Sequence, residues 1–207
     1  WIPGGQRVNA FECAIPADWS SATFFLCAGA LGAGPITLTG LDLDDPQGDK
    51  AVVDMLRQMG ARIEATPAGL TVSGGDLHGA ELDLNATPDA LPALAATACF
   101  AAGETRLVNV AQARLKETDR IAVMAQELRK LGAEVTERED GLVVRESRLQ
   151  GALVEGHGDH RVVMALAVAG TRAGGETTVR TAEAVSITFP NFVELMASLG
   201  AQMQVSV

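Results

Sequence analysis

The chain has 207 residues, of which 47% are apolar and 20% charged, a composition typical of a folded globular protein with a substantial core. Its net charge of −10 argues against nucleic acid or an anionic membrane surface as the main partner, although a few Lys and Arg side chains can still gather around an anionic small substrate. The sequence contains no run of about 18 uninterrupted apolar residues, so it predicts no membrane span.

The predicted elements occur three times along the chain. Three amphipathic segments end at Gly60, Gly132 and Gly200, which lie 72 and 68 residues apart. A glycine directly after a helix favours the left-handed conformation that ends it. The first two glycines are followed by an alternating segment, a turn at Gly69 or Gly141 and a second alternating segment, which predicts a β-hairpin.

A second landmark keeps the same spacing. Asp18, Asp89 and Asp159 lie 71 and 70 residues apart, and each precedes an Ala-rich run for which Asp is a natural helix N-cap. Each run is followed by Gly and a short β-like segment, at 36–39, 105–110 and 177–180. The unit is therefore strand, helix, strand, helix, strand, with a further hairpin strand in the first two copies. We expect a single domain of three copies, at about 11–75, 81–148 and 152–207.

The two helices of each copy differ in pattern. The first is apolar nearly all round, as at 93–100, which predicts a fully buried helix. The second is amphipathic, with Glu127 and Lys130 opposite an apolar face made of Ile121, Met124, Ala125, Leu128 and Leu131. These patterns favour an α/β fold of three β-α-β-α-β-β units around buried central helices. The alternative is an α/β sandwich of unrelated elements.

The third copy is incomplete, because only one further strand fits between Gly200 and Val207. A missing strand leaves an open sheet edge, which proteins normally cover. We therefore expect a fragment of a larger protein, and we expect Trp1, which follows no initiating Met, to mark a processed or cut start.

The three cysteines cannot all pair, and none stands in a spacing typical of metal ligands. Cys27 and Cys99 lie in Ala-rich apolar runs, which predicts buried free thiols. We expect a cytoplasmic protein.

The densest charged segment is 114–120 (Arg-Leu-Lys-Glu-Thr-Asp-Arg), before the second helix of copy two. Thr118 or Asp119 would cap that helix, and its free N–H groups together with Lys116 and Arg120 would suit a phosphate or carboxylate. A solvated helix start with Glu117–Arg120 pairing fits the spacing equally well.

Two further polar groups open the buried helices of copies two and three. A role as helix N-cap accounts for Asp159. It does not account for Arg161, because burying a charged side chain at the start of an apolar helix costs free energy unless the side chain faces a cleft or a partner. His157 and His160 lack a third metal ligand. Asp89 is either a general base or a pure N-cap. Because no G-x-G-x-x-G or Walker pattern occurs, an anion site must be assembled from several repeats.

Together these motifs resemble the EPSP synthase (3-phosphoshikimate 1-carboxyvinyltransferase) family of enolpyruvyl transferases over almost the whole chain. The resemblance rests on 114–120 followed by 127–133 (Glu-Leu-Arg-Lys-Leu-Gly-Ala), on 159–161 (Asp-His-Arg), and on 18–25, 47–49 (Gln-Gly-Asp), 88–90 and 188–192 in the family's order. The Lys-Glu-Thr-Asp-Arg and Asp-His-Arg pair favours this family over its relative that acts on UDP-N-acetylglucosamine.

The resemblance implies the C-terminal portion of a shikimate-pathway enzyme for aromatic amino-acid biosynthesis, with an inverse α/β barrel fold and the N-terminal half missing. That enzyme transfers the enolpyruvyl group of phosphoenolpyruvate to the 5-hydroxyl of shikimate 3-phosphate. In the family, the extreme N-terminal segment returns to this domain, which would account for the incomplete third copy. No metal or organic cofactor is expected.

Carried over by motif, Asp89 would accept the hydroxyl proton and Glu117 would protonate the methylene carbon of phosphoenolpyruvate. Arg120 and Arg161 would hold the phosphate and carboxylate of phosphoenolpyruvate, for which guanidinium groups are apt. The expected substrate contacts also include Lys116, Gln112 and His160. Two positions depart from the pattern: Ile187 stands where some members have Lys, and Gln112 where some have Asn.

Two other functions remain open on the sequence. An amino-sugar enolpyruvyl transferase would use the same chemistry with another acceptor. A non-catalytic repeat domain that binds anions or a partner would leave Asp89, Lys116, Arg120 and Arg161 scattered over several faces.

Overall fold

The protein is described by a computed structural model that covers residues 1–32 and 34–206. The first copy comprises α1 (Trp19–Leu31), β1 (Ile36–Leu38), the 3-10 turn η1 (Gly48–Ala51), α2 (Val52–Gln58), β2 (Arg62–Thr66) and β3 (Gly69–Ser73). The second comprises β4 (Glu81–Asp83), η2 (Pro88–Ala90), α3 (Leu91–Ala98), β5 (Glu104–Val108), η3 (Ala111–Leu115), α4 (Arg120–Lys130), β6 (Glu134–Arg138) and β7 (Gly141–Arg145). The third comprises β8 (Leu153–Glu155), α5 (His160–Gly170), β9 (Thr178–Arg180), η4 (Ala182–Ala184), α6 (Val185–Thr188) and α7 (Phe192–Ser198).

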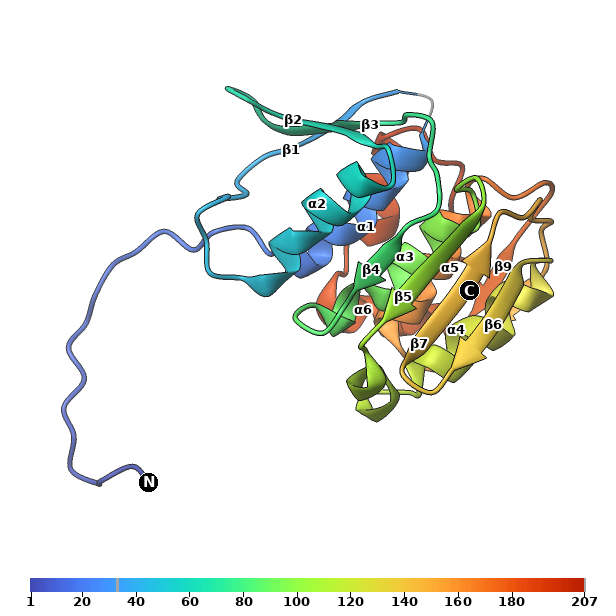
Figure 1. Cartoon of the computed structure of the whole chain (residues 1–207). Helices are drawn as coiled ribbons and strands as arrows, with labels where there is room; N and C mark the ends of the chain where they lie inside the picture. The colour runs from blue at the N-terminus through green and yellow to red at the C-terminus, as the bar shows by residue number, and fades with distance from the viewer. Residues whose placement is uncertain (33, 207) are drawn as a thin grey trace.

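The second copy shows the complete sheet, with strand order β4-β5-β7-β6. The β4 and β5 strands pair in parallel, whereas β5, β7 and β6 pair antiparallel. The first sheet has the order β1-β3-β2 and no counterpart of β4 within the described residues. The third sheet has only the parallel pair β8-β9. Figure 1 shows these sheets lying outside the central helices.

Two predicted strands are wrong. No strand forms between Gly200 and residue 206, because the hairpin partner that would pair with it is absent from the third sheet. No strand lies within residues 1–18, before α1, although the unit predicted one there. In copy three the helical segment before Gly200 is divided into α6 and α7 around Pro190, whose ring cannot continue a helix; the sequence patterns made no prediction at this point.

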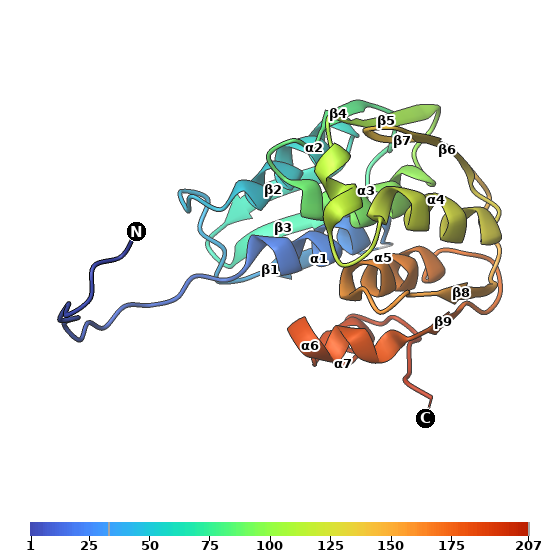
Figure 2. The same cartoon turned by 90° about the horizontal axis from the view of Figure 1, so that it is seen from below.

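The central helices α1, α3 and α5 pack against one another, as Figure 2 shows from below. All eight residues of α3 are buried, which confirms the helix predicted from its apolar pattern. The two buried hydroxyls of these helices bond to carbonyls one turn back, Thr23 to Trp19 at 3.0 Å and Thr97 to Ala93 at 2.9 Å. The core therefore accommodates these polar groups without leaving the hydroxyls unpaired.

The helix-ending glycines are confirmed. Gly60, Gly132 and Gly200 have φ values of +98°, +92° and +96°, a region that side-chain-bearing residues rarely adopt. At Gly60 the backbone is also crowded, because an added Cβ would lie 2.6 Å from the carbonyl oxygen of Asp76.

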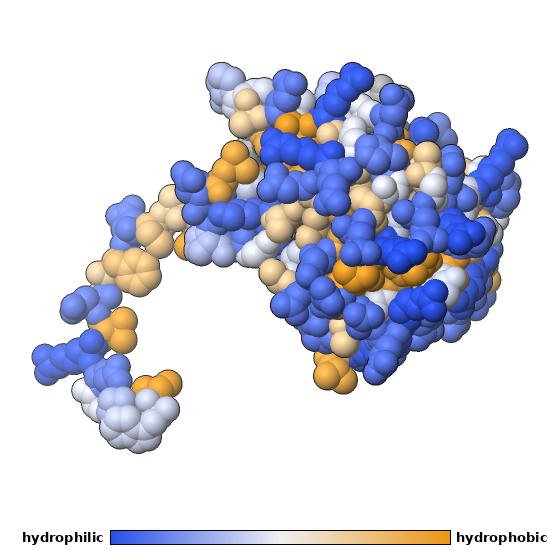
Figure 3. All heavy atoms as spheres, viewed as in Figure 1, coloured by the Kyte–Doolittle hydropathy of each residue, from blue (hydrophilic) through white to orange (hydrophobic). Residues whose placement is uncertain are grey.

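The first sixteen residues form an extended arm that leaves the body of the molecule (Figures 1 and 2). Large apolar side chains on this arm are exposed, among them Val8, Phe11 and Ile15 (Figure 3). The arm joins the body where the N–H of Ala17 donates to the carbonyl of Gly40 at 3.0 Å.

The amphipathic pattern of α4 is confirmed on its apolar face and wrong on one residue of the polar face. All five predicted apolar residues are fully buried, namely Ile121, Met124, Ala125, Leu128 and Leu131. Glu127 is fully buried as well. Its carboxylate accepts hydrogen bonds from Lys130 Nζ at 2.7 Å, His157 Nε2 at 2.9 Å and the N–H of Glu155 at 2.9 Å. These donors compensate the burial, which sequence spacing alone does not reveal.

Candidate active site

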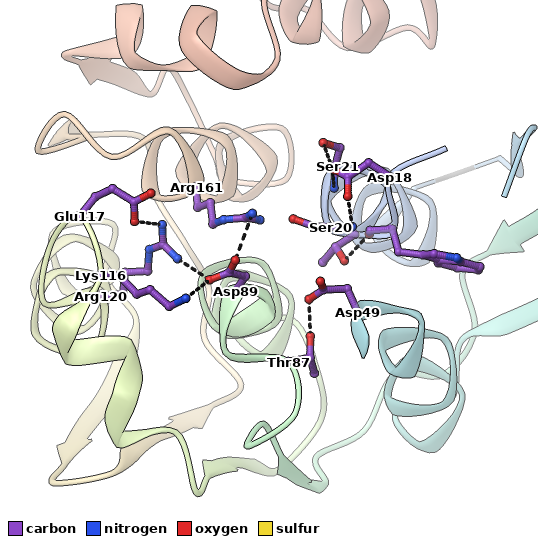
Figure 4. A network of polar contacts seen from close by, with 12 residues as sticks. Asp18, Ser20, Ser21, Asp49, Thr87, Asp89, Lys116, Glu117, Arg120 and Arg161 are labelled. Atoms are coloured by element: carbon purple, nitrogen blue, oxygen red, sulfur yellow. Dashed lines mark hydrogen bonds and ion pairs between the residues drawn. The ribbon is translucent and has the colours of Figure 1, made fainter. Parts of the chain in front are cut away.

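The starts of three helices meet at one end of the central bundle. Asp89 lies in η2 at the start of α3, Arg120 is the first residue of α4, and Arg161 is the second residue of α5. Lys116 and Glu117 belong to the loop that precedes α4. Figure 4 shows the three cationic side chains directed toward Asp89. The positive N-terminal ends of α4 and α5 lie at the same place as these cations.

The three repeated aspartates do not play the same part. Asp18 caps α1 by accepting the N–H of Ser20 at 3.2 Å and of Ser21 at 2.9 Å, and Asp159 caps α5 by accepting the N–H of Arg161 at 2.9 Å. Asp89 makes no capping hydrogen bond. The interpretation of Asp89 as a pure N-cap is therefore wrong, and its carboxylate is available for other contacts.

Asp89 forms three ion pairs. Its Oδ1 lies 3.0 Å from Lys116 Nζ and 2.9 Å from Arg120 Nη1, and its Oδ2 lies 3.2 Å from Arg161 Nη2. Burial raises the pKa of this carboxyl, but the charges of Arg161, Lys116 and Arg120 outweigh burial and hold the pKa below its ordinary value of 3.8. Asp89 is therefore ionised at neutral pH.

Arg120 is enclosed by carboxylates. Only 1% of its side chain is exposed, and its Nε lies 2.7 Å from Oδ2 of Asp159, whose side chain is 0% exposed. Its Nη2 lies 2.5 Å from Glu117, the i,i+3 pair that the spacing allowed. The hydroxyl of Thr118 donates to Asp159 at 3.1 Å, so Thr118 binds the next helix and Asp119 caps α4 by accepting the N–H of Ala122 at 3.0 Å.

Arg114 holds the loop that carries Lys116 and Glu117, a role that the sequence did not reveal. Its guanidinium lies 2.7 Å from Asp119 and 2.9 Å from Glu137, and it donates to two backbone carbonyls of the β6–β7 turn. The only signal in the sequence was the density of charges of both signs in 114–120, which does not reveal where any one of these side chains points.

The two remaining candidates lie beside this cluster rather than in it. Gln112 donates from Nε2 to the carbonyl of Asn85 at 3.0 Å, in the segment that leads to Asp89. His160 is 9% exposed, and its ring has no hydrogen-bond partner in the part of the chain that the structure describes. Burial and the neighbouring Arg161 charge lower the pKa of His160 below its ordinary value of 6.5, so the ring is neutral at pH 7.

The cluster lies on an open face. The side chain of Glu117 is 49% exposed and that of Lys116 32%. Two hollows of about 710 and 450 Å³ lie at the other ends of the central helices, where both are lined by Phe100 and Arg172. None of the candidate residues lines either hollow.

The charges of the cluster balance. Lys116, Arg120 and Arg161 face Asp89, Glu117 and Asp159. Within residues 1–32 and 34–206, no three His, Cys, Asp or Glu side chains gather so as to hold a metal ion. No helix in those ranges has the length and hydropathy to cross a membrane. The arrangement offers an ionised carboxylate beside guanidinium and ammonium groups, which suits proton transfer next to a bound anion.

Comparison with known proteins gives a consistent result. The sequence model of the family described as EPSP synthase (3-phosphoshikimate 1-carboxyvinyltransferase) matches residues 1–196. A 3-phosphoshikimate 1-carboxyvinyltransferase of Ruminiclostridium cellulolyticum is 56% identical over 204 residues, which cover 99% of this chain and 48% of that protein. One of Acetivibrio thermocellus is 54% identical over 203 residues, covering 98% and 48%. The chain thus spans about half the length of the curated relatives it matches.

The structural comparison agrees. An EPSP synthase from Acinetobacter baumannii superposes with a TM-score of 0.84 at 33% identity, over 93% of this chain and 48% of that one. The enolpyruvyl transferase NikO from Streptomyces tendae has a TM-score of 0.70 at 22% identity, over 92% and 44%, a likeness of fold alone. The predicted fold of three units around buried helices is confirmed, and the chain belongs to the EPSP synthase family.

Proposed function

We propose that this chain forms one wall of an active site that transfers the enolpyruvyl group of phosphoenolpyruvate to the 5-hydroxyl of shikimate 3-phosphate and releases phosphate. The observation that carries this proposal is the meeting of Lys116, Arg120 and Arg161 at Asp89, the one repeated aspartate that caps no helix. Membership of the family and the names of the relatives support the substrates.

Asp89 is the general base of this reaction. A carboxylate that is ionised at neutral pH can accept the proton of the 5-hydroxyl as that oxygen attacks C2 of phosphoenolpyruvate. Three cations make Asp89 a weak base before substrate binds. When substrate anions draw these cations toward themselves, the pKa of Asp89 rises and its proton affinity increases.

The three cations differ in how accessible they are to the substrate anions. Arg161, 14% exposed, and Lys116, 32% exposed, are accessible as they stand, and they contact phosphoenolpyruvate and shikimate 3-phosphate respectively. Arg120, 1% exposed, becomes available to phosphoenolpyruvate when the exposed Glu117 side chain leaves its Nη2. Gln112 and His160 contact substrate from the border of the cluster.

Glu117 is the general acid that protonates the methylene carbon of phosphoenolpyruvate. As the 5-hydroxyl oxygen bonds to C2 of phosphoenolpyruvate, the methylene carbon takes a proton from Glu117, which takes up that proton from solvent after its carboxylate leaves Arg120, and a tetrahedral intermediate forms. Transfer of a methyl proton back to the Glu117 carboxylate and departure of phosphate from this intermediate then give the enol ether. The ion pair with Arg120 holds Glu117 at the site, and its exposure leaves it free to turn toward the substrate.

The remaining half of the enzyme completes the site. Because the cations and carboxylates of this cluster balance, binding two anionic substrates requires further cations from the other half. Ile187, 79% exposed, stands where some members of the family carry Lys and supplies no such charge. Three free thiols are compatible with a reducing cytoplasm, where we place the reaction.

Reconstitution tests this proposal. The chain is mixed with the part of the Ruminiclostridium cellulolyticum relative that it does not match, and phosphate release from phosphoenolpyruvate is measured with shikimate 3-phosphate or UDP-N-acetylglucosamine as acceptor. We expect release with shikimate 3-phosphate only, and only when both parts are present. Release with UDP-N-acetylglucosamine alone would instead support an amino-sugar transferase, and the absence of release with either acceptor would contradict a catalytic role.

A further inference from the structure

The segment Gln47, Gly48 and Asp49 has no role in the reaction described above, yet it packs directly against the turn that carries Asp89. We propose that Asp49, acting through Thr87, is a positioning residue that holds the Asp89 carboxylate in place. This inference rests on the proposed function of Asp89 as the base, and it concerns a contact between the first and second copies of the repeat.

The central contact is a short hydrogen bond between two copies. The hydroxyl of Thr87 donates to Oδ1 of Asp49 at 2.6 Å, and Thr87 is 1% exposed (Figure 4). Thr87 in turn fixes the turn that follows it, because its carbonyl accepts the N–H of Ala90 at 3.1 Å. Asp89 lies inside this turn, two residues after the anchored side chain.

Gly48 and Gln47 support the same contact from either side. A Cβ on Gly48 would lie 2.9 Å from the carbonyl oxygen of Ala86, so only glycine lets η1 approach the Asp89 turn this closely. The Gln47 side chain accepts the N–H of Trp19 at 2.9 Å and donates to the carbonyl of Ala17 at 3.1 Å. The segment that carries Asp49 is thereby tied to the start of α1.

The corresponding contact between the second and third copies contains an arginine, whereas the contact between the first and second copies does not. The continuous helical stretches 48–58 and 120–130 correspond, so Gly48 occupies the position of Arg120. Arg120 reaches across to the next copy and neutralises Asp159, the counterpart of Asp89. With Gly48 and the Thr87–Asp49 hydrogen bond, which involves no cation, in the corresponding place, the first copy holds the Asp89 turn without occupying the Asp89 carboxylate. That carboxylate remains directed at Lys116, Arg120 and Arg161.

Two pairs of variants test the contact. Thr87→Val and Asp49→Ala remove the hydrogen bond, whereas Thr87→Ser and Asp49→Asn retain a donor and an acceptor. Thr105→Val is the matched control, because Thr105 is equally buried, has a hydroxyl without a partner and lies on β5. Thermal unfolding first establishes which variants are folded.

The first measurement is a ¹³C carboxylate NMR titration of the 207-residue chain, with the Asp89 signal assigned from Asp89→Asn. In the unmodified chain, Asp89 titrates below its ordinary pKa of 3.8. We expect folded Thr87→Val and Asp49→Ala to raise this pKa toward 3.8, because the carboxylate is no longer fixed among its cations. The conservative variants and Thr105→Val leave it unchanged. An unchanged Asp89 pKa in folded Thr87→Val would overturn the inference.

The second measurement uses the reconstituted enzyme. We expect Thr87→Val to lower kcat about tenfold or more with little change in the KM for phosphoenolpyruvate, since displacing a catalytic group costs rate more than binding. Thr87→Ser restores kcat. If the unmodified pair is inactive but the NMR shift occurs, the proposed function fails and the positioning contact stands. If the pair is active and Thr87→Val leaves kcat unchanged, the positioning role is contradicted.

Discussion

Arg120 and Asp159 form an ion pair in which neither side chain is accessible to solvent. Nε of Arg120 lies 2.7 Å from Oδ2 of Asp159, and the two side chains are 1% and 0% exposed. The pair joins the first residue of α4 to the N-cap of α5, and therefore joins the second copy of the repeat to the third. The same guanidinium contacts Asp89, so the site and the core of the fold share one residue.

Truncation of Arg120 should destabilise the chain severely. Arg120→Ala leaves the buried Asp159 carboxylate without its cation, although Thr118 and the N–H of Arg161 still donate to it, and breaking a buried pair in this way costs about 3–5 kcal/mol. Urea unfolding followed by circular dichroism measures the loss in the free energy of unfolding. Arg106→Ala is the control, since the Arg106–Glu104 pair is exposed and should contribute little. Equal losses in the two variants would show that burial of the Arg120 pair does not matter.

Stability should fall at acid pH. Burial raises the pKa of Asp159 and Glu127, but hydrogen bonds from Arg120 and from Lys130 respectively outweigh it and hold both pKa values below the ordinary 3.8 and 4.5. A lowered folded-state pKa stabilises the fold above the ordinary value, and this stabilisation is lost as the pH falls through the folded-state pKa.

Unfolding free energies measured from pH 7 down to pH 3 test this expectation. The unmodified chain should lose stability progressively below about pH 4.5. Glu127→Gln should be less stable at pH 7 and show a shallower acid dependence, because one of the responsible groups no longer titrates. A Glu127→Gln profile parallel to that of the unmodified chain would contradict the assignment.

Much of the fold could be predicted from the sequence, because the residues that mark helix ends and buried helices recur at regular spacing. Gly60 and Gly132 mark helix ends, and the apolar run of α3 predicts a buried helix, since each signal depends on local backbone preference or burial. The missing strand before α1 and the split at Pro190 were not predicted. Strand formation depends on a partner at the sheet edge, which repeat spacing cannot supply.

The residues of the candidate site could be named from the sequence, but their arrangement in space could be predicted only in part. The motifs named Asp89, Lys116 and Arg120, but spacing could not decide whether Asp89 caps its helix or faces cations. Glu127 was expected on the polar face, and its burial depends on His157 from another element. Likewise the Asp49–Thr87 hydrogen bond joins residues 38 positions apart, beyond the reach of any local pattern.

The three cysteines should differ in reactivity. Burial raises the pKa of Cys27 and of Cys99 to about 12, whereas Cys13 is exposed. Since the thiolate is the reactive form, Ellman's reagent at pH 8 should label one thiol in the folded chain and three after denaturation. Cys13→Ser should abolish the fast reaction. Rapid labelling of more than one thiol in the folded chain would contradict the buried positions.

Removing an unpaired buried hydroxyl should stabilise the chain. Thr105 Oγ1 has no hydrogen-bond partner among the described residues, and Thr105 is 1% exposed. Thr105→Val keeps the shape, removes the desolvated group and suits a strand, so we expect a gain of about 1 kcal/mol in the free energy of unfolding. Thr97→Val is the comparison, because its hydroxyl bonds to Ala93 and no gain is expected. Destabilisation by Thr105→Val would indicate that the hydroxyl is satisfied in solution.

The most direct test of the central claim is the turnover of Asp89→Asn in the reconstituted enzyme. Asn keeps the size of the side chain but cannot accept the hydroxyl proton. The account predicts that phosphate release from phosphoenolpyruvate and shikimate 3-phosphate falls by about 10²–10⁴-fold, the usual contribution of a general base. A folded Asp89→Asn variant with turnover within about threefold of the unmodified pair would contradict it.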